Sequence, residues 1–109
     1  MAKQKNKIEA LILDYINVLK KKIKLQRVIL FGSYAHGKPN KYSDIDLAVF
    51  SNDFKDKNEI ETMQMLFQLA CTIDSRIEPV AFEPNEIKLL KYKPFLREVL
   101  KKGKVVYKN

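Results

Sequence analysis

The chain has 109 residues, of which 46% are hydrophobic and 31% charged, and its 21 Lys and Arg against 13 Asp and Glu give a net charge of +8. This length and composition predict one folded domain over residues 1–109 and exclude an intrinsically disordered chain. The single cysteine, Cys71, excludes an internal disulfide, and no apolar run reaches the roughly 18 residues of a membrane-spanning helix. We therefore expect a cytoplasmic protein that does not contact a membrane.

The first elements alternate between helix and strand. Apolar residues recur at steps of three and four over residues 5–22, which predicts an amphipathic helix. Residues 27–31 are rich in β-branched and aromatic side chains, and they predict a buried strand that stops at Gly32. Residues 43–50 alternate between two faces, which predicts a half-buried second strand. Residues 57–72 then predict a second long helix, in which Cys71 is a small buried residue.

Prolines and a glycine mark the elements of the last third. Residues 76–82 predict a third strand, in which Pro79 has no N–H for a ladder and so favours an edge position or an early end to pairing on one side. Pro84 opens a helix, and Pro94 divides the helical pattern over 86–102 into two pieces. Gly103 ends this helix before a last strand at 104–107. The order predicts an α+β fold, a small mixed β-sheet with helices packed mainly on one face.

A Gly-Ser pair follows the first predicted strand. A strand that ends in Gly32-Ser33 and continues into a short turn of helix leaves backbone N–H groups unpaired. Glycine lets an anion approach the backbone, so a phosphate can be held there by these amides and the Ser33 hydroxyl. A plain tight turn is the alternative interpretation of this pair.

Two carboxylates follow on the second predicted strand. Asp44 and Asp46 share one face, because residues i and i+2 of a strand lie about 6.5–7 Å apart on the same side. Two such charges about 4 Å apart repel by roughly 4 kcal/mol, so the pair needs a cation or a shifted pKa. Carboxylate oxygens favour Mg²⁺ or Mn²⁺. A solvated strand face is the alternative, and Glu78 on the third strand is either a third carboxylate of the site or a surface acid.

Together the two segments, residues 32–37 and 43–47, resemble the nucleotidyltransferase signature of the DNA polymerase beta superfamily, in which Asp-x-Asp follows Gly-Ser. Ten residues, from Tyr34 to Ser43, separate the two motifs here. The chain looks most like the minimal nucleotidyltransferases, small single domains often found as antitoxin partners of HEPN-domain toxins. Residues 95–107 resemble the C-terminus of the same family. His36 stands where the family commonly has arginine, and Glu78 where aspartate is frequent.

This resemblance implies a metal-dependent nucleotidyltransferase that moves AMP, or another nucleoside monophosphate, from ATP to a hydroxyl group. Asp44 and Asp46 would hold Mg²⁺ or Mn²⁺, and Glu78 would complete the metal site or act as base. Gly32 and Ser33 would cradle the β- and γ-phosphates. The acceptor implied is a tyrosine of a cognate HEPN toxin, which makes this chain its antitoxin. The alternative is an antitoxin that neutralises its partner by binding alone.

The remaining charged residues have less specific interpretations. His36 can assist proton transfer or donate a simple hydrogen bond, and Lys38 and Lys41 can screen a triphosphate or belong to a solvated loop. Lysines cluster at residues 3–7, 20–24 and 101–108. They suggest nucleic-acid binding, solvated helix faces or an acidic protein partner. No recognised nucleic-acid module accompanies them, so we do not expect nucleic acid to be the partner.

Overall fold

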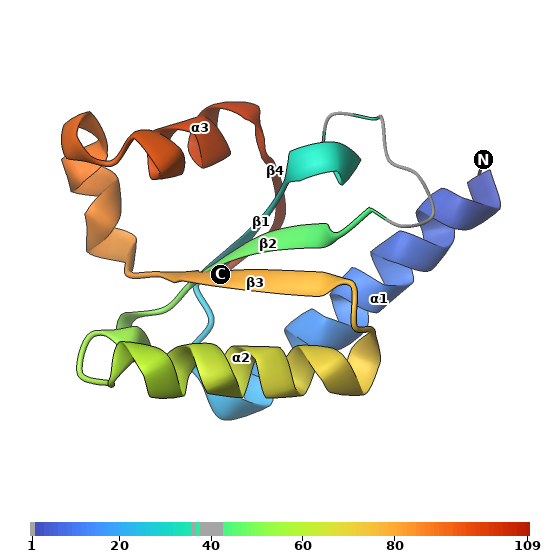
Figure 1. The fold of residues 1–109 in the computed structure, drawn as a ribbon, viewed down its shortest axis with the longest axis horizontal. Helices are drawn as coiled ribbons and strands as arrows, with labels where there is room; N and C mark the ends of the chain where they lie inside the picture. The colour runs from blue at the N-terminus through green and yellow to red at the C-terminus, as the bar shows by residue number, and fades with distance from the viewer. Residues whose placement is uncertain (1, 36, 38–42) are drawn as a thin grey trace.

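The structure is a computed structural model that describes residues 2–35, 37 and 43–109 (Figure 1). The α-helices are α1 (Ala2–Lys22), α2 (Glu59–Ile73) and α3 (Pro94–Lys102), and the strands are β1 (Arg27–Phe31), β2 (Ile45–Phe50), β3 (Ile77–Phe82) and β4 (Lys104–Lys108). Short 3₁₀ segments are η1 (Gly32–Tyr34), η2 (Asn52–Phe54) and η3 (Pro84–Tyr92). Each predicted strand is present within two residues of its predicted bounds. None of the described helices is both long and apolar enough to cross a bilayer.

The four strands form one mixed sheet in the order β3-β2-β1-β4. β1 pairs antiparallel with both β2 and β4, whereas β2 and β3 run parallel. β3 is an edge strand, as Pro79 predicts. Arg76 and Phe82 direct their carbonyl oxygens to β2, so the backbone of the odd-numbered residues between them faces outward. The nitrogen of Pro79, which cannot donate, therefore lies on the side where no ladder is needed.

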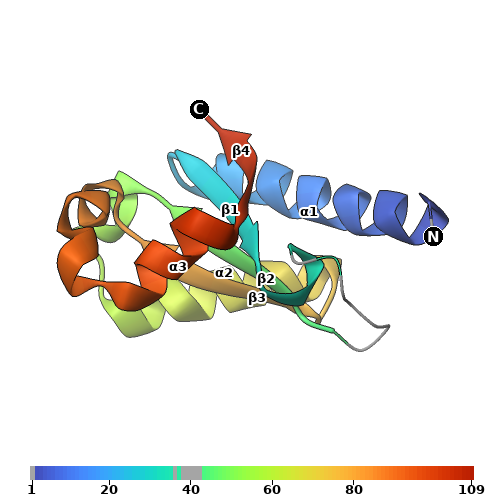
Figure 2. The same ribbon diagram turned by 90° about the horizontal axis from the view of Figure 1, so that it is seen from above.

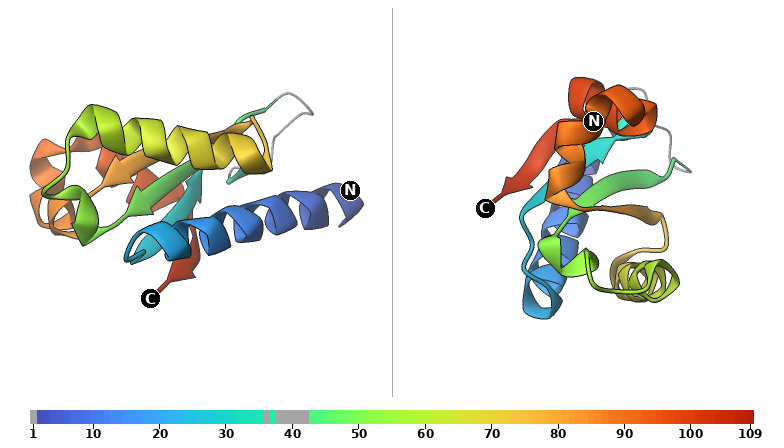
Figure 3. Two further views of the ribbon diagram at one scale, coloured as in Figure 1. Left: turned by 90° about the horizontal axis from the view of Figure 1, so that it is seen from below. Right: turned by 90° about the vertical axis from the view of Figure 1, so that its left-hand side faces the viewer.

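The two long helices, α1 and α2, cover one face of the sheet (Figure 3, left). The apolar stripe of α1 and the buried side of α2 pack there against alternate strand residues such as Val28, Leu47 and Val49. Tyr15 is fully buried between the helices, where its hydroxyl donates a 2.9 Å hydrogen bond to the Leu66 carbonyl. The predicted α+β fold with helices mainly on one face is confirmed.

The opposite face of the sheet carries the shorter η3 and α3 (Figure 2). Leu96 and Val99 of α3 pack there against Ala48 and Phe50 of β2, all of which are buried. The prediction of a half-buried second strand is therefore wrong for the end of β2 that α3 covers. Ala48 and Phe50 are themselves apolar, and the alternation that was expected to separate core from solvent separates two cores instead.

The prediction of a buried Cys71 is also wrong, since this side chain is exposed. The helix α2 begins after Asn58, whose side chain accepts hydrogen bonds from the backbone of Ile60 and Glu61. Its buried stripe consists of Thr62, Leu66 and Ala70. Cys71 follows this stripe by one residue, which turns its side chain about 100° away from the core.

Candidate functional site

The predicted carboxylates lie at the end of the sheet face that α3 leaves open. Asp46 is directly opposite Phe31 on β1 and in register with Glu78 on β3. Residues paired in this way share a face, so Phe31, Asp46 and Glu78 form one row across three strands. The next row, Ile29, Ala48 and Val80, is the one against which α3 packs. Asp44 precedes β2 and is exposed beside the row.

The three carboxylates influence one another. Burial and then the charge of Asp44 raise the pKa of Asp46 above its usual range. Partial burial also raises the pKa of Glu78, followed by the charges of Asp44 and Asp46 and a hydrogen-bonding contact with Asp44. The structure thus brings together the residues that the sequence placed on two separate strands.

Gly32 adjoins this row. It has a φ of +74°, and a Cβ added to it would collide with the carboxylate of Asp46. Glycine is needed here both because the backbone is left-handed and because the Asp46 side chain occupies the adjoining space. The sequence analysis gave only the second kind of reason, close approach to the backbone, and assigned the space to a phosphate instead of the Asp46 side chain.

Ser33 follows in η1, where its side chain is exposed. Phe31 is the N-cap residue of this turn and gives no side-chain hydrogen bond to it, while the Ala35 N–H donates to the Gly32 carbonyl at 3.1 Å. The first N–H groups of a helical turn lack partners within the turn itself. This segment therefore presents a hydroxyl and backbone donors beside the carboxylate row.

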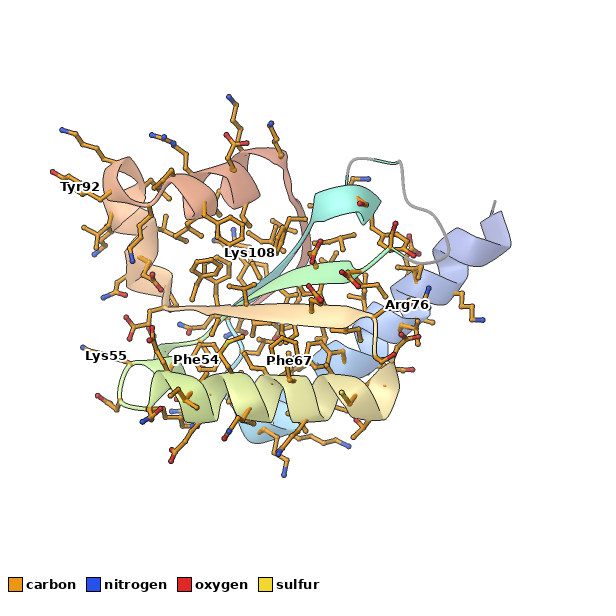
Figure 4. The ribbon with its side chains drawn as sticks, viewed as in Figure 1. Phe54, Lys55, Phe67, Arg76, Tyr92 and Lys108 are labelled. Carbon is orange, nitrogen blue, oxygen red and sulfur yellow. The ribbon has the colours of Figure 1, made fainter. Side chains whose placement is uncertain are left out.

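An arginine that the sequence analysis did not single out stands at the same end of the sheet (Figure 4). The Arg76 guanidinium donates from Nε and Nη2 to the two carboxylate oxygens of Asp74, at 3.1 and 3.0 Å. Its carbonyl accepts from the Ile45 N–H at 2.8 Å, beside Asp44. The buried hydroxyl of Tyr34 in η1 lies near the guanidinium and contributes to the raised pKa of Arg76. Arg76 thereby fixes the start of β3 next to η1.

The donor set suits a hard divalent cation, because a positive charge would relieve the repulsion that, after burial, contributes to the raised pKa values of Asp46 and Glu78. No three Asp, Glu, His or Cys side chains in the described part of the chain are arranged as a complete metal site. Asp44 and Asp46 are the residues that could hold a metal together with phosphate oxygens. His36, Lys38 and Lys41, which the sequence analysis considered, lie outside the described residues.

The candidate residues do not line the large groove of the molecule. That groove, about 1040 Å³, lies between α2 and η3 along the outer side of β3, and exposed Ile60, Phe67 and Leu89 line it. The carboxylate row instead occupies open sheet surface. Phe31 and Arg76 were missed by the sequence analysis because only the strand register reveals their neighbours.

Comparison with known proteins agrees with this arrangement. Residues 14–109 match the family described as Polymerase beta, Nucleotidyltransferase. The protein adenylyltransferase MntA of Shewanella oneidensis is 39% identical over 75 residues, which cover 69% of this chain and 48% of MntA. MJ0604 of Methanocaldococcus jannaschii, named as a protein adenylyltransferase, is 31% identical over 102 residues, or 91% of this chain and 97% of that protein.

A crystal structure of a toxin-antitoxin with AMP-PNP has a TM-score of 0.65 and 30% identity, over 93% of this chain and 73% of that chain. The chain spans about half of the length of MntA and of another relative from Methanocaldococcus jannaschii. It spans nearly all of MJ0604. The family match over residues 14–109 and these relatives confirm the identification from the two motifs: the chain belongs to the polymerase beta nucleotidyltransferase family, as a minimal nucleotidyltransferase.

Proposed function

We propose that this chain transfers AMP from ATP to a hydroxyl group and releases pyrophosphate. The observation that carries the proposal is the position of Asp46. Its side chain lies in one row with Phe31 and Glu78, and its carboxylate lies directly against Gly32 of the Gly-Ser turn. Donors for phosphate oxygens and carboxylates for a cation thus meet at one point. The similarity to a toxin-antitoxin structure containing AMP-PNP supports an adenine nucleotide as the substrate.

The residues have separate tasks in this reaction. Ser33 and the backbone of η1 bind the β- and γ-phosphates, which orients the α-phosphorus toward the carboxylates. Asp44 and Asp46 would hold Mg²⁺ or Mn²⁺, and the bound cation would stabilise the charge that develops on the α-phosphate and the leaving pyrophosphate. Glu78 accepts the proton of the attacking hydroxyl, a task that its raised pKa favours. The new bond joins the acceptor oxygen to the α-phosphorus, and the bond to the β-phosphate oxygen breaks.

We propose further that the acceptor is a tyrosine of a cognate HEPN-domain toxin and that the chain acts as its antitoxin. The relative with 39% identity is a protein adenylyltransferase, and the toxin-antitoxin structure supports the setting. The resemblance noted from the sequence supports the HEPN class. Neutralisation by binding alone is the competing function. Both functions require a complex with the toxin, but only AMP transfer leaves a covalent product.

Intact-mass measurement of the toxin separates the two. After incubation with this chain, ATP and Mg²⁺, the toxin should gain the mass of AMP less one water for each transfer. The double variant Asp44→Asn, Asp46→Asn should lose transfer by several powers of ten, because charge stabilisation worth several kcal/mol is removed. Asp56→Asn, an exposed carboxylate outside the site, is the matched control and should transfer normally.

Two results would contradict parts of this proposal. An unmodified toxin that both the wild type and the double variant silence equally would establish binding alone. Full transfer by Glu78→Gln would leave the Asp44 and Asp46 assignments standing and remove Glu78 from the role of base.

A further inference from the structure

An exposed aromatic ring stands next to the carboxylate row. Phe95, the second residue of α3, is 52% exposed. Its ring meets that of Phe31 in an edge contact, with centroids 5.6 Å apart and planes inclined by 75°. A second, tilted contact joins Phe95 to Phe82 at 6.2 Å. Because Phe31 lies directly opposite Asp46 and contacts Phe95, Phe95 adjoins the site on the side where α3 covers the sheet.

The core of α3 does not depend on this ring. Leu96 and Val99 anchor the helix to the sheet, and they are only 1% and 2% exposed. Single exposed apolar residues are common on protein surfaces, so exposure alone assigns nothing to Phe95. Its position is informative, because it continues the face that holds Asp46 and Glu78.

We propose that Phe95, supported from the side by Phe31, is the surface on which the purine base of ATP stacks. The inference rests on the proposed function. With the β- and γ-phosphates at Gly32 and Ser33 and the α-phosphate at the carboxylates, the ribose and base must extend away from η1. The sheet face ends at α3 in that direction, and Phe95 is the aromatic residue at this boundary. A flat ring that is already partly desolvated by two neighbouring rings stacks a base at low entropic cost.

Stacking predicts a weak preference for the base. Every base presents a π-face, so an aromatic surface holds different purines with similar strength. The affinities for ATP and GTP should then differ by less than tenfold. A site that recognises the base edge through hydrogen bonds would discriminate between them more strongly.

A tryptophan reporter tests the position of the base directly, because the chain contains no tryptophan. In Phe95→Trp, ATP with Mg²⁺ should quench the indole fluorescence, whereas inorganic tripolyphosphate, which has no base, should not. Tyr92→Trp is the matched control. Tyr92 is 73% exposed at the far end of η3 and contacts Lys91 rather than Phe31 (Figure 4). Its fluorescence should not respond to ATP.

Calorimetry gives the energetic test. Phe95→Ala should weaken ATP binding about tenfold and leave tripolyphosphate binding unchanged, while Tyr92→Ala should change neither. Unchanged ATP binding by Phe95→Ala, or a loss shared equally by tripolyphosphate, would overturn the stacking role and leave the proposed function intact. Loss of toxin binding with normal ATP binding would make Phe95 a partner contact instead. If the wild type binds neither ATP nor tripolyphosphate, the proposed function fails and this inference fails with it.

Discussion

Gly32 and Gly37 allow the contribution of the Asp46 contact to be isolated. Both residues have a φ of +74°, but among the described residues a Cβ would meet another group only at Gly32, where it meets the Asp46 carboxylate; no described atom lies within 4 Å of a Cβ at Gly37. Substitution by alanine imposes the same backbone strain at both positions, about 1–2 kcal/mol. Any additional effect at Gly32 must arise from displacement of Asp46.

We therefore expect Gly32→Ala to lower the free energy of unfolding by more than Gly37→Ala and to weaken Mn²⁺ and ATP binding, which Gly37→Ala should preserve. Urea unfolding and calorimetry measure the two effects. In the Asp46→Ala background, the stability cost of Gly32→Ala should fall to that of Gly37→Ala. Equal costs of the two alanines in the wild-type background would show that Asp46 does not depend on the space at Gly32.

Asp74 links stability to pH. Hydrogen bonds from the Arg76 side chain, and then from its backbone, hold the pKa of Asp74 below the usual range. A carboxyl with a lowered folded pKa stabilises the fold above its unfolded pKa of about 3.9, and this contribution is lost as the pH falls through the folded pKa. Asp74→Asn should thus lower the free energy of unfolding by about 0.5–1 kcal/mol at pH 7.

The difference between Asp74→Asn and wild type should begin to narrow as the pH falls below about 4, where the unfolded carboxyl takes up a proton, and should close only below the lowered pKa of the folded Asp74. Urea unfolding at pH 7 and pH 3 measures it. Because the chain carries a net charge of +8, Asp56→Asn controls for the loss of any negative charge. A deficit of Asp74→Asn that persists unchanged at pH 3 would place its effect outside the Arg76 interaction.

At the level of elements, Gly103 decides how closely α3 approaches β1. Its φ is −78°, so the backbone does not require glycine. A Cβ there would meet the Ile29 side chain and the carbonyl oxygens of Val99 and Leu30. Gly103 ends the helix as predicted, but the reason is lack of space and not a left-handed conformation.

Gly103→Ala has two opposing effects. Reduced freedom of the unfolded chain would stabilise the fold by about 0.4–1 kcal/mol if space were available. The collision with Ile29 and two backbone oxygens should outweigh it and give a net loss of about 1–3 kcal/mol in urea unfolding. A more stable Gly103→Ala would mean that α3 can move away from β1 without cost.

The elements themselves could largely be predicted, because each depends on residues close in sequence. The stripe of α1, the break at Pro94 and the edge position of β3 all follow from local pattern. The pairing of Phe31 with Asp46 could not be predicted, since the segment between β1 and β2 does not fix their register. The second core could not be predicted either, because it depends on contacts between distant segments. Alternation in β2 shows which residues share a face, but it does not show that α3 covers Ala48 and Phe50.

The family motifs identified the candidate site from the sequence because they combine residue type with spacing. Asp44 and Asp46 lie close together because only one residue separates them in the sequence. The contact of Gly32 with Asp46 and the neighbourhood of Glu78 depend on the whole sheet. Phe95 and Arg76 come from segments far along the chain, so only the folded structure reveals that they adjoin the carboxylates.

At the scale of the whole molecule, the lysines of residues 20–24 and of β4 lie away from the carboxylate row, whereas Arg76 lies beside it. The backbone N–H of Lys24 donates to the Asp53 carboxylate just beyond the end of β2. Lys108 of β4 is the register partner of Arg27, which begins β1 at the end far from Phe31. Lys20 stacks over the Tyr107 ring and joins the end of α1 to β4. The lysine clusters of residues 20–24 and of β4 therefore meet at one end of the sheet, and the candidate site lies at the other.

This separation predicts that the basic end does not contribute to ATP binding at physiological salt. Arg27 and Phe31 are four residues apart on β1, roughly 13 Å along the strand, whereas charges are screened over about 8 Å at 0.15 M ionic strength. Lys24→Gln with Lys108→Gln should leave the calorimetric Kd for ATP within twofold of wild type at 0.15 M salt. At 0.01 M, where screening extends over about 30 Å, the same variant should bind ATP more weakly. A loss of several-fold already at 0.15 M would mean that these lysines touch the nucleotide, and it would move the triphosphate away from Gly32 and Ser33.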